Sequence, residues 1–205
     1  MDRKASVNKT ILLKKWGFHM AKEKLITNAQ IKKSLQDFSR EELITLITDI
    51  AQACPQAKEF LTVKLASHEN INEILEKYKQ KVEYEFFPKR GFGRLNVREA
   101  KKAISDFRKI CNDKAMGIDI MLFYVENCVE FTDQFGDINE AFYNSAVSVY
   151  SSVIKEINSG DMNLYQTFAN RLKAAANNAC EGWGFQDDMR DLYYQIDFLE
   201  GEDED

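Results

Sequence analysis

The fold is decided by residues 114–131, which read KAMGIDIMLFYVENCVEF. Apolar side chains crowd this stretch: Met121, Leu122 and Phe123 follow one another, and Val125 and Val129 continue the pattern. A helix that is apolar on nearly all sides is buried among other elements rather than lying at a surface. The stretch therefore predicts a central helix in the core of a helical protein.

Five further helices are expected before this central one. Helix-starting signals mark where each begins, and they are Thr27, a capping box in SREE (residues 39–42), Pro55, Asn70 and Asn96. The third helix is expected to run out near His68, and the fourth to end at Phe86, because Pro88 restricts the residue before it. Apolar positions three or four apart follow each signal, as expected for helices with one buried face.

After the central helix, Gly136 and Asp137 break the chain, and helical patterns follow over residues 138–157, 163–178 and 186–198. Helices joined by turns this short lie antiparallel to their neighbours. No strand pattern competes with them. The sequence therefore predicts an all-α fold of about eight or nine helices, either a multi-helical bundle or a short stack of antiparallel helical hairpins.

With 205 residues, 44% of them hydrophobic, the chain is long enough to bury a proper core. We expect one helical domain over residues 20–198 and an acidic, disordered tail over residues 199–205. Residues 1–19 are expected to be either an extension before a start at Met20 or a basic arm. No apolar run is long enough to span a bilayer and no secretion signal is visible, so a soluble protein is expected.

Charge is divided unequally along the chain. Residues 1–110 carry 23 Lys and Arg against 14 Asp and Glu, whereas residues 111–205 carry 5 against 19. Such halves either dock on each other or present a basic surface for phosphates beside an acidic face. The sequence pI of about 5.3 argues against avid general binding of nucleic acid.

Cysteine and histidine usage argues against metal and nucleophile chemistry. The four cysteines, Cys54, Cys111, Cys128 and Cys180, are widely spaced and are expected to be reduced, buried thiols. His19 and His68 have no cysteine or second histidine at ligand spacing. No cofactor, metal ion or catalytic residue is therefore expected.

The best candidate site is FFPKRGFGR, residues 86–94. Its cations Lys89, Arg90 and Arg94, with Arg98 and Lys101 in the following helix, suit a phosphate, and Phe92 between two glycines could stack on a base. The structural interpretation is equally coherent: the phenylalanines fill the core and the arginines pair with carboxylates of the acidic half. Both interpretations are open from the sequence.

A second candidate segment begins at GWGFQDD, residues 182–188. Its aromatic residues Trp183 and Phe185, with Asp187 and Asp191 after them, could receive the basic loop and join two ends of the fold. A cleft between the two segments is the alternative. In a structural role, an acid at a helix start is stabilised by the helix dipole.

A third group contains only acids, and they are Glu126, Glu130, Asp133, Asp137 and Glu140. Glu126 and Glu130 lie one helical turn apart, where two carboxylates can share a metal ion. No histidine accompanies them and the ligand order of a calcium-binding loop is absent. A solvated acidic face is therefore the default, and a metal-dependent hydrolase the alternative.

Several strings in this chain resemble a bacterial family of small helical proteins that is known only as a domain of unknown function. They are SREELI (39–44), EFFPKRGFG (85–93), AKKAISDF (100–107), YVEN (124–127), EFT (130–132), WGF (183–185) and DLYY (191–194). The resemblance covers most of residues 20–198 and implies a bacterial, cytoplasmic setting without an assigned activity. A histidine often follows Trp-Gly-Phe in that family, where this chain has Gln186.

These observations favour a non-enzymatic interaction domain in which residues 86–94 and residues 183–191 form one composite surface. A protein or peptide is the leading partner. The first alternative is a nucleic-acid or phosphate binder that uses the basic loop, and the second is a metal-dependent, hydrolase-like enzyme that uses Glu126, Glu130 and Asp187.

Overall fold

The computed structural model describes residues 25–65, 68–91 and 93–199. Within these ranges the chain forms nine α-helices, one short 3-10 helix and no strand, which confirms the all-α prediction. Contacts within the chain divide it into two units, residues 1–50 and 51–205, and each is described by itself. Residues 1–19 and all but Leu199 of the expected acidic tail lie outside the described ranges.

The first unit contains α2 (Asn28–Ser34) and most of α3 (Arg40–Ala53). Both predicted N-terminal caps are confirmed. The side chain of Thr27 accepts from Gln30 N, and Ser39 and Glu42 form the reciprocal bonds of a capping box. No side chain between residues 25 and 50 is buried, although α3 carries Ile44 and Ile47.

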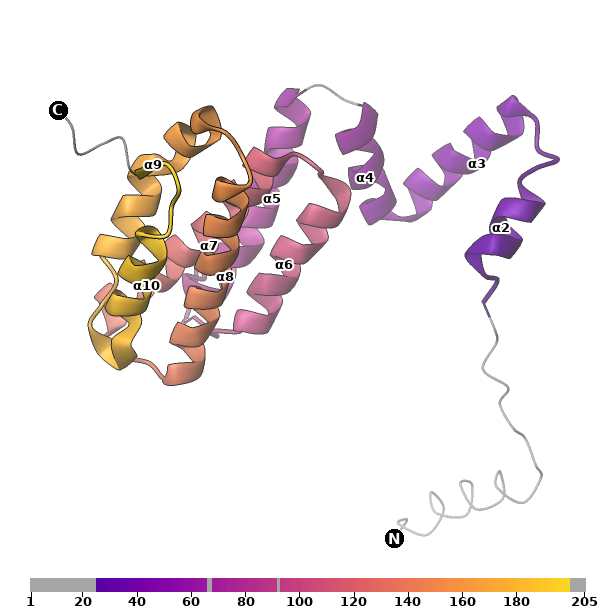
Figure 1. Ribbon diagram of the computed structural model, residues 1–205. Coiled ribbons are helices and arrows are strands. Elements are labelled where there is room, and N and C mark those ends of the chain that lie inside the picture. Colours follow the sequence, from indigo (N-terminus) through magenta and orange to yellow (C-terminus); the bar gives the residue numbers. More distant parts are fainter. Residues whose placement is uncertain (1–24, 66–67, 92, 200–205) are drawn as a thin grey trace, which may run out of the picture. The chain divides into compact units, whose positions relative to one another are not determined.

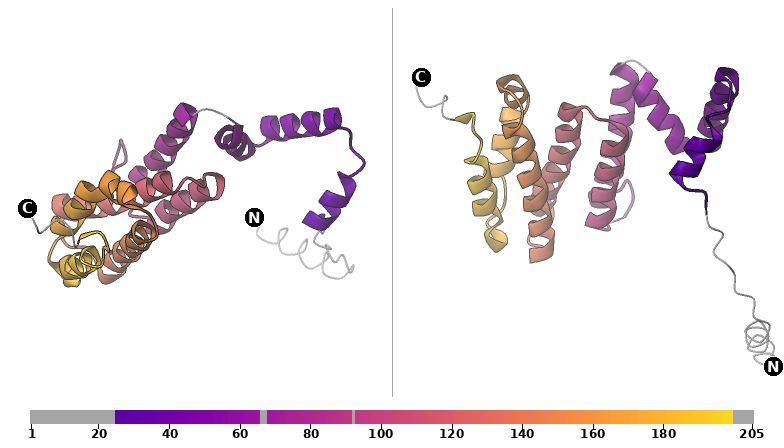
Figure 2. Two further views of the ribbon diagram at one scale, coloured as in Figure 1. Left: turned by 45° about the horizontal axis from the view of Figure 1, so that its top comes forward. Right: turned by 45° about the vertical axis from the view of Figure 1, so that its right-hand side comes forward.

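The second unit contains the remaining helices (Figure 1). They are α4 (Pro55–Leu65), α5 (His68–Phe86), α6 (Val97–Ile110), α7 (Lys114–Phe135), α8 (Glu140–Asn158), α9 (Met162–Asn177), the 3-10 helix η1 (Gly182–Gly184) and α10 (Phe185–Tyr193). From α5 to α10 the helices alternate in direction, as Figures 1 and 2 show. The connections after α5, α7 and α9 therefore lie at the same end of the bundle, which we call the loop end.

The predicted central helix is confirmed as α7, which packs against α5, α6, α8 and α9. Ile118, Leu122 and Val125 on it are fully buried. Each such side chain contributes about 1.5–3 kcal/mol when it leaves water. The helix continues to Phe135 and ends at Gly136, whose φ of +83° suits a residue without a Cβ. The bundle is therefore organised around the stretch that the sequence identified.

Some helix bounds differ from the sequence prediction. α5 begins at His68, so Asn70 lies in its first turn rather than capping it, and α8 begins at Glu140 because Asn139 caps it. The last helix ends at Tyr193, not Phe198. Its backbone turns there because the side chain of Asn158 accepts from Asp197 N and donates to Gln195 O, which supplies partners that a longer helix would have provided.

None of the helices in the described ranges has the length and apolar character required to cross a membrane.

Candidate binding surface at the loop end

The loop after α5 folds back on the end of that helix. Leu95 N donates to Glu85 O at 2.9 Å, and this return brings Gly93 against the backbone of Phe86. A Cβ at position 93 would lie 2.1 Å from Phe86 O, so only glycine fits there. Gly91 has a φ of +82°, a conformation that side chains disfavour. Both glycines are therefore required by the path of the loop.

The cations of the loop point to solvent. Lys89, Arg90 and Arg94 are exposed, and so is Arg98 in the first turn of α6. None of these four side chains makes an ion pair or hydrogen bond with another residue that the structure describes. The expected alternative, in which Arg90 and Arg94 pair with the acidic half, is not what the described residues show. Phe92 lies outside the described ranges.

The phenylalanines of the loop do anchor it, as the structural interpretation expected. Phe86 is buried, with ring centroids 5.7 Å from Tyr124, 6.3 Å from Phe131 and 6.4 Å from Phe142. Phe87 is half-buried, and its ring lies 5.8 Å from that of Phe131. The loop therefore joins a structural corner to exposed cations that have no partner in the described part of the chain.

The second candidate segment lies at the same end of the bundle. Trp183, in η1, is 59% exposed, and its Nε1 donates to Asp137 Oδ2 at 3.1 Å. Asp187 and Asp191 are exposed on α10. Phe185, which the sequence assigned to the binding surface, is instead fully buried, and its ring centroid lies 5.0 Å from that of Tyr143. It contributes to the core rather than to the surface.

The turn between α7 and α8 carries the residue that holds Trp183. Tyr143 OH donates to Asp137 Oδ1 at 2.7 Å and accepts from Ile138 N at 3.3 Å. Burial raises the pKa of the Tyr143 phenol well above its usual range, and its hydrogen bonds to Cys180 and Asp137 raise it further. The phenol therefore stays protonated and serves as a fixed donor to the Asp137 carboxylate.

This turn also connects the two candidate segments. Phe135, at the end of α7, is 53% exposed, and its ring centroid lies 4.6 Å from that of Phe131 and 6.4 Å from that of Phe87. Residues 87–91, 93 and 94 are therefore linked through this turn to Phe135, Asp137 and Trp183, and we call these residues the loop-end surface. Sequence reasoning missed Phe135 and Tyr143, because nothing local marks an apolar helix position as exposed or a tyrosine as a donor.

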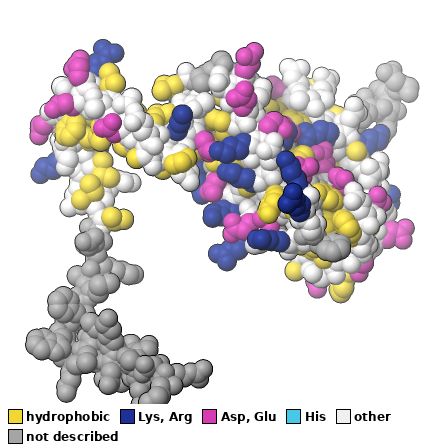
Figure 3. Space-filling view, turned by 180° about the vertical axis from the view of Figure 1, so that it is seen from behind, with side chains coloured by type: hydrophobic (Ala, Val, Ile, Leu, Met, Phe, Trp, Pro, Cys, Tyr) yellow, Lys and Arg dark blue, Asp and Glu magenta, His cyan; other side chains and the backbone are white. Residues whose placement is uncertain are grey.

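Three further cations lie apart from this arrangement. Lys101 lies one turn after Arg98 in α6 and lines a groove of about 400 Å³. The groove is also lined by Arg108 and Lys109 of α6, Met121 of α7 and Val149 of α8. Figure 3 shows Lys and Arg side chains gathered over one face of the second unit, with acidic and hydrophobic side chains among them. The positive charge of α5 and α6 is therefore spread beyond the loop.

The acidic group does not form a metal centre in the described ranges. Arg171 of α9 holds Glu126 through two hydrogen bonds, Nε to Oε1 at 2.7 Å and Nη2 to Oε2 at 2.8 Å. Its Nη1 also donates to Asp119 Oδ1 at 2.5 Å. No group of three or more His, Cys, Asp or Glu side chains there is arranged to hold a metal ion. Glu126 is therefore an ion-pair partner that fastens α9 to α7.

Comparison with known protein families places residues 26–197 in a family of unknown function, DUF6155. This chain belongs to that family. The resemblance to a domain of unknown function is thereby confirmed. Comparisons of the chain with curated proteins and with solved structures find no match. Because DUF6155 carries no assigned activity, the role of this member has to be argued from its surface.

Proposed function

We propose that this protein is a non-enzymatic interaction domain that binds a protein or peptide partner through the loop-end surface. One observation carries the proposal: the exposed ring of Phe135 lies 6.4 Å from that of Phe87 in the basic loop, where Lys89, Arg90 and Arg94 have no partner among the described residues, and Trp183 is exposed at the same end of the bundle. Aromatic residues and arginine are the side chains that dominate binding energy at protein interfaces. A rigid bundle end that presents both suits a docking surface.

The chemistry of the surface favours a partner with acidic and apolar groups. Lys89, Arg90 and Arg94 would meet carboxylates, and the two exposed rings would meet an apolar anchor. Catalysis has less support, because both oxygens of Asp137 already accept hydrogen bonds from Trp183 and Tyr143. Glu126 is likewise engaged by Arg171. The surface therefore offers recognition groups rather than an unengaged acid or base.

A nucleic acid or phosphate ligand is the second candidate, and the same exposed cations favour it. Binding of this kind depends steeply on salt, since each phosphate contact releases counterions. Stacking of bases on the exposed Trp183 ring would add a contribution that is independent of sequence. The loop-end surface would then bind a single strand of nucleic acid rather than a peptide.

The test compares the wild-type protein with three variants in affinity enrichment from its native cells. Arg90→Ala/Arg94→Ala removes two loop cations, Trp183→Ala removes an aromatic anchor, and Lys155→Ala/Lys173→Ala is the control with an equal change in charge on α8 and α9. The proposal expects a partner that the first two variants lose and the control keeps. The purified partner should bind the wild type and the control variant, and it should bind Arg90→Ala/Arg94→Ala and Trp183→Ala more weakly.

Labelled single-stranded and duplex oligonucleotides at low and moderate salt complete the experiment. If an oligonucleotide binds in a salt-dependent manner and the Arg90→Ala/Arg94→Ala variant loses this binding, the ligand of the surface is a nucleic acid rather than a protein. A purified partner that binds all variants equally would overturn the assignment of the surface itself.

We further propose a bacterial cytoplasmic setting. The resemblance of the sequence to a bacterial family supports it. So do the four free cysteines, two of them buried and two half-buried, because thiols stay reduced in the cytosol.

A further inference from the structure

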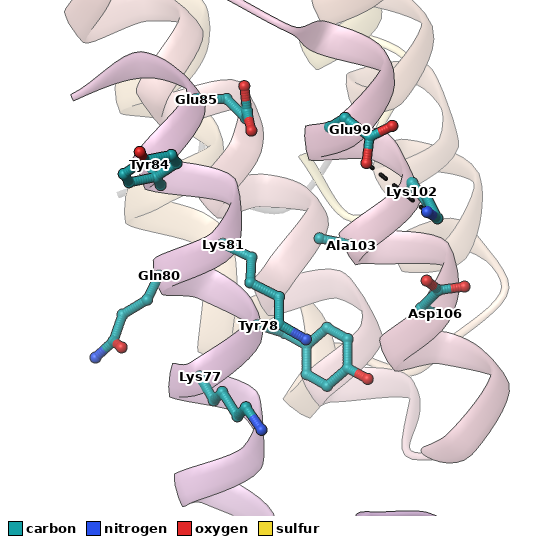
Figure 4. Close-up of a pocket in the computed structure, with 10 residues that line it drawn as sticks. All are labelled: Lys77, Tyr78, Gln80, Lys81, Tyr84, Glu85, Glu99, Lys102, Ala103 and Asp106. Carbon is teal, nitrogen blue, oxygen red and sulfur yellow. Dashed lines mark ion pairs between the residues drawn. The ribbon is translucent and has the colours of Figure 1, made fainter. Parts of the chain in front are cut away.

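A groove lies between α5 and α6 (Figure 4). It has a volume of about 540 Å³. Lysines and acids from both helices line it, and Tyr84 stands at its rim with 51% of its surface exposed. The loop-end surface does not include these residues, so the site is independent of the proposed function.

The lysines of the groove are already engaged. Lys77 pairs with Glu59 of α4, and the Lys81 Nζ lies 3.8 Å from the centroid of the Tyr78 ring. Lys102 lies 3.8 Å from Glu99 on its own helix. Figure 4 shows Lys81 bent over Tyr78, away from Glu85 one turn later. Lys81 precedes Glu85 by four residues, and this order is less favourable for a helical ion pair than glutamate before lysine.

Among the three acids that line the groove, Glu85 has no lysine partner in the described part of the chain. Asp106 pairs with Lys109 at 2.8 Å, and Glu99 has Lys102. Glu85 Oε2 is buried and has no hydrogen-bond partner in the described part of the chain. A buried carboxylate oxygen without a donor is unfavourable, so such an atom in a folded protein calls for an explanation.

A ligand with paired N–H donors would supply what Glu85 lacks. Figure 4 shows the Glu85 carboxylate extending from α5 toward α6, where Glu99 lies on the facing wall. The terminal torsion of a glutamate is soft, so either oxygen can turn toward the groove. A guanidinium group fits this setting best, because its planar fork binds a carboxylate through two parallel hydrogen bonds and it stacks on aromatic faces.

We propose that the α5–α6 groove binds a guanidinium group through the Glu85 carboxylate, with Glu99 and Tyr84 as flanking contacts. An arginine side chain of a peptide and a free arginine-like small molecule share this chemistry. The site differs from the loop-end surface in the sign of the ligand it takes, since it receives a cation where the loop receives an acid.

The test titrates the full-length protein with N-acetyl-arginine amide and follows backbone amide resonances by NMR. N-acetyl-citrulline amide, which has nearly the same shape but no charge, is the matched control ligand. Glu85→Gln is the test variant. Glu83→Gln is the control variant, because Glu83 is exposed on the same helix and does not line the groove. Dispersed spectra of both variants establish that they fold.

Saturable shifts at Tyr84, Glu85 and Glu99 are expected with the arginine probe in the wild type and in Glu83→Gln. Binding should weaken by about tenfold or more in Glu85→Gln, as expected for the loss of a charge-assisted pair of hydrogen bonds. Equal shifts with the citrulline probe, or no saturable shift with arginine in the millimolar range, would overturn the proposal.

A second arm identifies the source of the guanidinium. Tighter binding of the peptide Gly-Arg-Gly than of N-acetyl-arginine amide would place the group on a peptide, and equal affinity would place it on a small molecule.

A third readout requires no ligand. Glu85→Gln should raise the melting temperature of the free protein, because the neutral amide is less costly to bury than a carboxylate without a donor. A lowered melting temperature would show that Glu85 has a partner within the chain.

Discussion

Trp183 and Asp137 stand 46 residues apart in the chain, and the indole Nε1 of one donates to Oδ2 of the other at 3.1 Å. The other oxygen of Asp137 accepts from Tyr143 OH at 2.7 Å. One carboxylate thus ties η1 to the start of α8. Trp183 has a φ of +54°, which is uncommon for a residue with a side chain and persists only where the surroundings hold it.

Asp137→Ala should release this arrangement. Removing the acceptor leaves the Tyr143 hydroxyl and the indole N–H without their partner, which should lower the free energy of unfolding by about 1–3 kcal/mol. In a Trp16→Phe background, Trp183 is the remaining tryptophan, so its emission should shift to the red as the ring becomes more solvated. Urea unfolding and fluorescence check this. Asp133→Ala, exposed at the end of α7, is the control and should change neither quantity.

Gly93→Ala and Gly91→Ala should differ in severity. A Cβ at position 93 meets the backbone oxygen of Phe86, which cannot move aside, so a loss of more than about 2 kcal/mol is expected. At position 91 a Cβ has open space and meets only the cost of a positive φ, about 1 kcal/mol. Chemical denaturation of both variants measures the difference. Equal losses would mean that the loop takes another path in solution.

Arg171→Ala should destabilise the packing of α9 on α7. It removes the cation that bridges the half-buried Glu126 and Asp119, although Asp119 keeps its ion pair with Lys79 at 2.8 Å. Because these groups are partly solvated, a loss of about 1–3 kcal/mol is expected rather than the larger value of a fully buried pair. Arg171→Lys should be intermediate, since an ammonium cannot form the two parallel bonds. Arg190→Ala, exposed on α10, serves as the control for a lost charge in urea denaturation.

Glu59 should make stability depend on pH. Burial alone would raise the pKa of its carboxyl, but hydrogen bonds from Lys77 and Tyr78 and the nearby positive charge of Lys77 and Lys81 outweigh burial, so the pKa lies below the ordinary 4.5. A lowered folded-state pKa contributes stability above the unfolded value, and this contribution is lost as the pH falls through the folded value.

Glu59→Gln should therefore be less stable than the wild type at pH 7, and the difference should shrink once the pH falls below about 4.5. Thermal melts across that range provide the measurement. Glu73→Gln, exposed on α5 away from this pair, should track the wild type at every pH. A difference between Glu59→Gln and the wild type that stays constant with pH would contradict the role given to the ion pair.

The helices were predictable because their signals are local. Thr27, Ser39 and Asn96 cap the helices that they were expected to cap, and Pro55 begins α4 as its ring geometry favours. The misplaced helix ends have tertiary causes. The last helix stops at Tyr193 because Asn158, from another helix, binds the backbone beyond it.

The candidate site was predictable only in part. Composition singled out the basic loop and the Trp183 segment, and the structure places both at the loop end. Composition could not show that Phe185 faces the core while Trp183 stays exposed, because the two lie two residues apart in one string. It also assigned Asp137 to an acidic group, whereas the partners of this residue are Tyr143 and Trp183.

The sequence by itself determined the all-α class, the central place of α7 and nearly every helix, because periodicity and capping act over a few neighbouring residues. Tertiary structure alone decided which side chains are partners: Glu126 with Arg171, Asp137 with Trp183, and Glu85 with no described residue. The two pairs join residues from elements that are distant in the chain. They follow from how the helices pack in space, which spacing along the chain does not encode.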